Sequence, residues 1–239
     1  LISSLKLATL EGKDPIYKQG QIRWYKKPDR QYTYLVALDP SLGTGGDASA
    51  IQVLEMPSMI QVAEWQHNRT MIPGQIEILK QINQYIKESA GEDTLIYWSV
   101  ENNTIGEAAL IVINEMGEEN IPGIFLSEPA KMGSSRRYRR GFTTTNKSKL
   151  AACSKFKNLL ETDRLTVNSK NLISELKNFV AIGGGYRAKL GEKDDLVLSI
   201  LLAVRMGQFI SGFDSKIYEK FAEKFESETM APMPIFVLR

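Results

Sequence analysis

Cysteine and histidine are almost absent from this sequence of 239 residues, which contains one of each. A single cysteine, Cys153, excludes an intrachain disulfide and a cysteine-based zinc site, and it fits a reducing compartment. Nucleophilic catalysis of the Ser–His or Cys–His type would have to pass through His67. No carboxylate pattern surrounds His67, so we interpret it as a structural or surface residue.

Long apolar runs and targeting signals are also missing. No apolar segment is long enough to cross a bilayer, so we expect no membrane partner. Residues 1–14 (LISSLKLATLEGKD) have neither the basic start nor the continuous apolar core of a signal peptide. The pattern G-x-x-x-x-G-K-[ST] does not occur either, which excludes a P-loop ATPase site in this chain.

Charge is balanced overall, at a formal net charge of +2, but not locally. Between Pro129 and Asn158 there is no acidic residue, and an aromatic residue interrupts the basic run RRYRR at 136–140. This pattern suits contact with a sugar-phosphate backbone, although a solvated basic loop has the same composition. The candidate DNA-binding residues, from this segment and from the approach to the last predicted helix, are Arg136, Arg137, Arg139, Arg140, Lys147, Lys149, Lys189 and Lys193.

Hydrophobic patterning predicts an α/β fold. The expected strands are 33–39, 49–56, 59–66, 94–101 and 122–128, and the expected helices are 73–90, 104–118, 146–161, 170–179 and 194–212. Thr104 and Glu107 form a predicted capping box, and residues 181–193 a predicted glycine-rich hairpin. Residues 1–30, broken by glycine and proline, are expected to form an arm or linker. Three meandering strands followed by alternating helices and strands predict that residues 31–239 form a ribonuclease H-like domain, with a mixed central sheet and helices on both faces.

Three acidic residues stand at the ends of these elements. Asp39 ends the first predicted strand, Glu101 ends the fourth, and Asp195 begins the last helix. In this topology the first and fourth strands are neighbours and the last helix packs beside them, so we expect the three acids to converge. Converging carboxylates repel one another and are costly to desolvate unless a hard divalent cation holds them. The hypothesis is therefore a site for Mg²⁺ or Mn²⁺, with two ions about 3.5–4 Å apart, that hydrolyses phosphodiesters. Asp194 is interpreted as a helix cap or an assisting metal ligand.

Three segments together resemble one protein family. They are YLVALDPSLGTGGDASAIQVLEM (34–56), LIYWSVENNTIGEAAL (95–110) and GEKDDLVLSILLAV (191–204), and they resemble the nuclease domain of the large terminase subunit of tailed bacteriophages, specifically the T-even-like group. The resemblance implies that Asp39, Glu101 and Asp195 bind metal and catalyse, and that Asp47 is a further metal ligand or lies near one. The chain departs from the family at Leu42–Gly43, where an acidic residue and glycine are common, and at Lys193, where a histidine is common.

The resemblance also implies an activity and a setting. The activity is a metal-dependent endonuclease that cuts concatemeric viral double-stranded DNA into genome lengths during headful packaging. The implied partners are double-stranded DNA, an ATPase domain of the same polypeptide, the portal protein and the small terminase subunit. The implied location is the host cell cytoplasm, at the viral prohead and not in the mature virion. The irregular N-terminus is expected to mark an excised C-terminal fragment, which cuts DNA but does not pump it.

Four alternatives compete with this interpretation. Residues 43–48 contain G-x-G-x-x-A, a degenerate dinucleotide fingerprint, but a strand is predicted where that motif needs a helix. A phosphate loop of the actin-like or sugar-kinase type also lies between two strands of this fold, and ATP binding would favour it. Metal-independent DNA binding without cleavage would favour a non-catalytic DNA-clamping module. A preference for four-way junctions would favour a Holliday-junction resolvase of the same fold.

Overall fold

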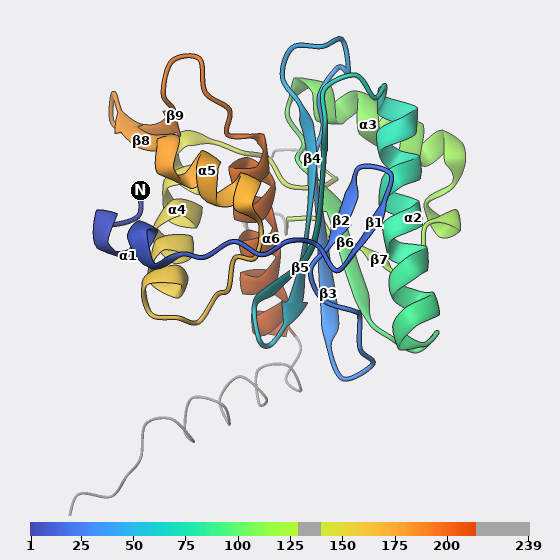
Figure 1. The fold of residues 1–239 in the computed structure, drawn as a ribbon. Coiled ribbons are helices and arrows are strands. Elements are labelled where there is room, and N and C mark those ends of the chain that lie inside the picture. The colour runs from blue at the N-terminus through green and yellow to red at the C-terminus, as the bar shows by residue number, and fades with distance from the viewer. Residues whose placement is uncertain (129–139, 214–239) are drawn as a thin grey trace, which may run out of the picture.

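A computed structural model describes residues 1–128 and 140–213, and its centre is a seven-stranded sheet in the order β1-β2-β5-β4-β3-β6-β7 (Figure 1). Its strands are β1 (Tyr17–Gln19), β2 (Ile22–Trp24), β3 (Thr33–Asp39), β4 (Ser49–Met56), β5 (Ile60–His67), β6 (Ile96–Val100) and β7 (Ile124–Phe125). Strands β1 to β5 pair in antiparallel fashion, whereas β6 runs parallel to both β3 and β7. The predicted mixed sheet is confirmed.

Helices cover both faces of this sheet, as predicted. Helices α2 (Ile72–Ala90) and α3 (Thr104–Met116) lie on one face, and α4 (Asn146–Glu161), α5 (Lys170–Asn178) and α6 (Asp195–Phe213) lie on the other (Figure 1). The remaining elements are α1 (Ser4–Thr9), the 3₁₀ turn η1 (Glu118–Asn120), and a separate hairpin of β8 (Phe179–Ile182) and β9 (Gly185–Ala188). No helix within residues 1–128 and 140–213 is both long and apolar enough to span a bilayer.

Strand β3 explains how an acidic residue reaches the edge of an apolar sheet. Its side chains alternate between two cores: Leu35 and Ala37 pack on the α4–α6 side, whereas Tyr34 and Val36 pack on the α2–α3 side. Because successive side chains of a strand point to opposite faces, Asp39 lies on the α4–α6 side. The register of β3 thus directs its terminal carboxylate toward α6.

Helix α6 is apolar almost all round because it packs between the sheet and the helices α4 and α5. Its buried apolar side chains include Leu196, Val197, Ile200 and Ala203. One of its buried polar residues, Ser199, donates its hydroxyl to the carbonyl of Ala37 in β3, at 2.8 Å. This bond ties α6 to the strand that ends at Asp39.

The N-terminal thirty residues are more than the arm we expected. Strand β2 pairs with β5, and its Ile22 and Trp24 are each only 1% exposed. The ring of Trp24 lies 4.4 Å, between centroids, from the ring of Tyr85 on α2. Strands of three residues between glycines and prolines carry too little periodicity for the sequence to reveal them.

Two smaller predictions are wrong. Asn103 caps α3 in place of Thr104, because its Oδ1 accepts hydrogen bonds from the amides of Ile105 and Gly106 at 3.1 Å each. The predicted strand 122–128 is reduced to Ile124–Phe125. Both differences concern the ends of elements, and neither moves the predicted site.

We expect Trp24→Ala to lower the free energy of unfolding by about 3–5 kcal/mol, because it empties a buried aromatic site. The measurement is urea denaturation followed by circular dichroism. Lys18→Ala on the exposed strand β1 is the control, and it should change stability by less than about 0.5 kcal/mol. Equal effects of the two substitutions would mean that β2 is not part of the folded core.

Candidate metal-binding active site

Asp39 and Glu101 lie side by side at the end of two parallel strands. Leu38 of β3 pairs with Val100 of β6, and the amide of Glu101 donates to the carbonyl of Leu38 at 2.9 Å. The carboxyl groups of Asp39 and Glu101 lie close enough to interact electrostatically, and both residues are only 7% exposed. Two nearly buried carboxyl groups therefore share one edge of the sheet.

Asp195 brings a third carboxylate to this edge from α6. It is the first residue of the helix, is 7% exposed, and accepts a hydrogen bond from the amide of Ala48 at 3.4 Å. Its charge acts on Asp39. The structure thus brings the three predicted acids into one interacting cluster.

Burial and nearby negative charge favour the protonated forms of Asp39 and Asp195. Burial raises the pKa of Asp39 well above its ordinary value, and the carboxyl groups of Glu101, Asp195 and Asp194 raise it further. Burial also raises the pKa of Asp195 to about 6, although the positive charge of Lys193 opposes that shift. When these carboxyl groups are ionised, a bound divalent cation would offset their concentrated negative charge.

The donor set fits a hard divalent cation, since it consists only of carboxylate oxygens. Among the residues that the structure describes, however, no three acidic, histidine or cysteine side chains are already grouped around a single ion position. Asp195 accepts from the amide of Ala48 through one oxygen, which leaves its other oxygen for an ion. The three side chains would have to move closer together to share one ion.

Asp47 and Asp194 have different surroundings. The side chain of Asp47 is 89% exposed and pairs with the ammonium group of Lys193 at 3.3 Å. Asp194 directly precedes α6, and its carbonyl accepts from the amide of Leu198 at 2.8 Å. Its carboxylate instead accepts from the amide of Ala188 at 3.2 Å, and so joins the β8–β9 hairpin to α6. Both acids act on Asp195 through their charge.

Of the four predicted DNA-binding arginines, the structure describes only Arg140. Arg136, Arg137 and Arg139 lie outside the described residues. Arg140 forms an ion pair with Glu118, and its guanidinium lies 4.9 Å from the centre of the Phe125 ring. Arg140 is therefore engaged in contacts with the protein itself.

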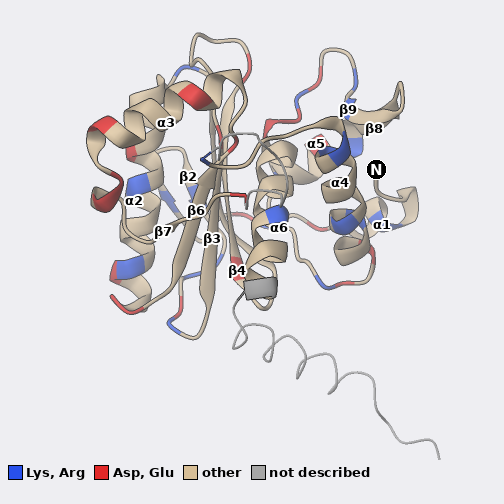
Figure 2. Ribbon diagram, turned by 180° about the vertical axis from the view of Figure 1, so that it is seen from behind, with Lys and Arg blue, Asp and Glu red and all other residues tan. Residues whose placement is uncertain are grey.

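The predicted lysines lie on the α4–α6 side of the sheet. Lys147 is exposed in the first turn of α4, and the ammonium group of Lys149 lies 5.4 Å from the centre of the Phe179 ring. Lys189 and Lys193 are exposed in the segment between β9 and α6. Figure 2 shows basic positions along α4, whereas acidic positions mark α3 on the other face.

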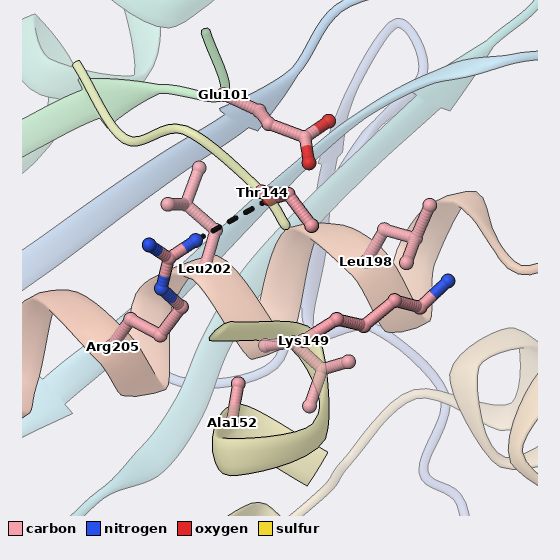
Figure 3. Close-up of a pocket in the computed structure, with 8 residues that line it drawn as sticks. Glu101, Thr144, Lys149, Ala152, Leu198, Leu202 and Arg205 are labelled. Carbon is pink, nitrogen blue, oxygen red and sulfur yellow. Dashed lines mark hydrogen bonds between the residues drawn. The ribbon is translucent and has the colours of Figure 1, made fainter. Parts of the chain in front are cut away.

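A small pocket beside Glu101 is lined by a basic side chain, that of Arg205, which was not among the predicted site residues (Figure 3). Arg205 of α6 is 6% exposed and donates to Thr144 Oγ1 at 3.3 Å and to Glu128 Oε2 at 3.2 Å. Burial lowers the pKa of Arg205, while the charges of Glu128 and Glu101 oppose the shift. Lys149 reaches the same pocket. The sequence feature that could have revealed Arg205 is a single arginine in a largely apolar helix.

Glu175 of α5 is a second residue that sequence analysis missed. Its Oε2 accepts from the amide of Val197 at 3.1 Å, and its Oε1 accepts from Gln66 Nε2 at 2.9 Å. It thereby satisfies a free amide in the first turn of α6, the turn that carries Asp195. Burial raises the pKa of Glu175 to about 7, and the charge of Asp195 adds to the shift. A glutamate on the buried face of α5 was the available signal.

Two substitutions of Glu175 should distinguish how its hydrogen bonds and its charge each affect stability. Glu175→Gln keeps an acceptor for Val197, whereas Glu175→Ala leaves buried polar groups unsatisfied and should lower the free energy of unfolding by about 1–3 kcal/mol. Because the folded-state pKa lies above the ordinary value, the contribution of Glu175 to stability is present at low pH and is lost as the pH rises through about 7. Glu175→Gln should therefore make the fall in stability between about pH 5 and pH 8 shallower, as measured by urea denaturation in EDTA. An unchanged slope would contradict the raised pKa.

Comparison with known proteins places this geometry in a family. Residues 36–206 match the family model described as the Terminase RNaseH-like domain. The large terminase nuclease of the thermophilic phage G20c, with bound magnesium, is 22% identical, with a TM-score of 0.60 over 84% of this chain and 94% of that one. The large terminase nuclease domain of Thermus phage P74-26 is 21% identical, with a TM-score of 0.58 over 83% and 91% of the two chains.

A viral enzyme from a different host is also similar. The nuclease domain of the human cytomegalovirus terminase, soaked with manganese, is 12% identical, with a TM-score of 0.55 over 86% of this chain and 94% of that one. At these identities the solved structures show a shared fold. The family model confirms the predicted terminase resemblance, while the T-even-like assignment stays a prediction. The family match runs from within β3 to within α6 and so includes most of the chain, and on that basis the chain belongs to the family of terminase RNaseH-like domains.

Proposed function

We propose that this chain is a metal-dependent endodeoxyribonuclease that cuts concatemeric viral double-stranded DNA into genome lengths during headful packaging. The observation that carries the proposal is the cluster of Asp39, Glu101 and Asp195, nearly buried carboxyl groups from three elements that meet at one sheet edge. Similar terminase nucleases have been crystallised with magnesium or cobalt, or soaked with manganese, which supports a divalent cation here.

The proposed cofactor is Mg²⁺ or Mn²⁺, with two ions. When bound, such ions activate a water molecule and stabilise the leaving oxygen of a phosphodiester. Asp39, Glu101 and Asp195 are the proposed ligands. Asp47 and Asp194 are placed to add negative charge, or a further oxygen ligand, beside Asp195.

The chain's own cations have a separate proposed role, which is to hold DNA near a negatively charged site. Lys149 lines the pocket beside Glu101, and Lys193 lies beside Asp47 and acts on Asp195. A nuclease with little sequence preference should contact phosphates rather than bases. The proposed DNA-contacting residues remain Arg136, Arg137, Arg139, Arg140, Lys147, Lys149, Lys189 and Lys193.

The biological setting follows from the same proposal. We place the protein in the host cell cytoplasm at the viral prohead, and not in the mature virion. Its proposed partners besides DNA are an ATPase domain of the same polypeptide, the portal protein and the small terminase subunit. The pattern G-x-G-x-x-A at residues 43–48 leads into strand β4 and not into a helix, which argues against a dinucleotide site.

Asp39→Asn should reduce cleavage of plasmid DNA in Mg²⁺ or Mn²⁺ below detection, because it removes a proposed ligand. The same variant should be at least as stable as the wild type in EDTA, since it relieves repulsion within the acid cluster. Gel electrophoresis and thermal denaturation measure the two effects. Asp93→Asn, at an exposed turn before β6, is the control and should cut normally. Cleavage in EDTA, or by Asp39→Asn, would contradict the proposal.

Changing Arg136, Arg137, Arg139 and Arg140 together to alanine should weaken DNA binding for all sequences alike. Each lost phosphate contact should reduce the magnitude of the slope of log K against log[salt] by about 0.9, because fewer counterions are released. Fluorescence anisotropy with duplex DNA in the absence of metal measures the slope. Changing Lys80 and Lys87 on α2, on the opposite face of the sheet, to alanine is the control. If the arginine variant keeps the wild-type affinity and slope, these arginines serve protein docking instead.

A further inference from the structure

The loop that follows Asp39 contains a high proportion of glycine. Residues 40–48 connect β3 to β4, contain Gly43, Gly45 and Gly46, and form no helix or strand. Glycine has more conformational freedom to lose on folding than any other residue, so such a loop keeps one shape only where contacts hold it. The contacts that hold this loop come from the segment that leads into α2.

The first contact is made by Gln75, a fully buried residue in the first turn of α2. Its Oε1 accepts from the amide of Ser41 at 3.3 Å, and its Nε2 donates to the carbonyl of Ser41 at 2.7 Å. The same Nε2 donates to the carbonyl of Thr70 at 2.7 Å. The side-chain amide thus pairs with the backbone two residues after Asp39, much as a neighbouring strand would.

Two further loop residues, Gly43 and Gly45, lie against residues 70 and 68, so the loop and this segment run in opposite directions. Gly43 has a φ of +72° and lies so close to Thr70 that a Cβ atom would come within 2.2 Å of the Thr70 carbonyl oxygen. The amide of Gly45 donates to the carbonyl of Asn68 at 2.7 Å, and Asn68 Nδ2 donates back to the carbonyl of Gly45 at 3.1 Å. One side of the loop is therefore fixed along its length.

The other end of the loop contacts the metal-binding region of α6. The amide of Ala48 donates to Asp195 Oδ2 at 3.4 Å, and the ammonium group of Lys193 contacts the carbonyl of Gly46 at 3.2 Å and Asp47 at 3.3 Å. The loop therefore runs from Asp39 to the surroundings of Asp195. A movement of the loop near Ala48 would alter its contact with Asp195.

We infer that Gln75 is a positioning residue for the metal site: by fixing the loop of residues 40–48, it sets the affinity for divalent metal. The inference rests on the proposed function, since it assumes that Asp39 and Asp195 bind metal. Gln75 touches neither acid and acts through Ser41. A loop that is already ordered loses less conformational freedom when metal binds, and binding is tighter for that reason.

Gln75→Met is the direct test, because methionine is similar in length and cannot make the three hydrogen bonds. Asn83→Leu is the matched control: Asn83 lies on the same helix and is equally buried, but its Nδ2 donates to the carbonyl of Pro122, at 2.8 Å, and not to the loop. Both variants lose a buried amide and should be destabilised in thermal denaturation. Only Gln75→Met should weaken Mn²⁺ binding, by about tenfold in isothermal titration calorimetry without DNA.

Two further readouts distinguish positioning from a general loss of stability. Amide hydrogen exchange of residues 40–48 should increase in Gln75→Met and stay at the wild-type level in Asn83→Leu. In DNA cleavage, the Mn²⁺ concentration for half-maximal rate should rise by about the same factor as the dissociation constant, because the defect lies in metal binding. The rate at saturating Mn²⁺ should change much less.

Gly43→Ala tests the same loop from the opposite side and remains informative if Gln75→Met does not fold. Its control is Gly20→Ala, which has a φ of +58° but open space around the added Cβ atom. Both substitutions strain the backbone, and only Gly43→Ala should weaken Mn²⁺ binding.

The outcomes separate the inference from the proposed function. Equal Mn²⁺ affinity in Gln75→Met and Asn83→Leu, or in Gly43→Ala and Gly20→Ala, would overturn the positioning role while wild-type cleavage stands. Wild-type protein that neither binds Mn²⁺ nor cuts DNA with it would overturn the proposed function itself.

Discussion

Repulsion between carboxylates held almost out of water is the constraint on which this structure depends. Asp39, Glu101 and Asp195 are each 7% exposed, and the charges of Glu101 and Asp195 oppose the ionisation of Asp39. A fold keeps such a cluster only if the surrounding structure is stable enough to bear the cost. The pairing of β3 with β6, and the burial of α6 between the sheet and two helices, supply that stability.

Several neighbouring groups reduce the repulsion without neutralising it. The amide of Ala48 and the charge of Lys193 both lower the pKa of Asp195, and Arg205 places a buried cation near Glu101. Glu175 acts differently, because it adds another buried acid but bonds the first turn of α6. The cluster is therefore held in shape by bonds to backbone amides, and the neighbouring cations compensate its negative charge only in part.

The central sheet and the convergence of the three acids were predictable because each signal lies within one short segment, whereas the role of the acids stays a prediction. An apolar strand ending in Asp39 and an apolar helix beginning at Asp195 are visible without knowledge of the rest of the chain. Gln75 and Glu175 were not predictable, since their roles come from contacts with segments far away in the sequence. Strand β2 was not predicted, for another reason: three residues are too few to show an alternating pattern. Trp24 is recognised as a core residue only through its contact with Tyr85 on α2.

The alternation along β3 has a consequence for which sequence changes the protein can tolerate during evolution. Leu35 and Ala37 pack on the same face of the sheet toward which Asp39 points, so a shift of one residue would turn the carboxylate into the opposite core. A single-residue insertion or deletion between Thr33 and Asp39 would therefore disrupt packing and the acid cluster together. Changes of length should accumulate in the connections outside the sheet, and the distance along the chain from Leu35 to Asp39 should stay constant among descendants that still fold.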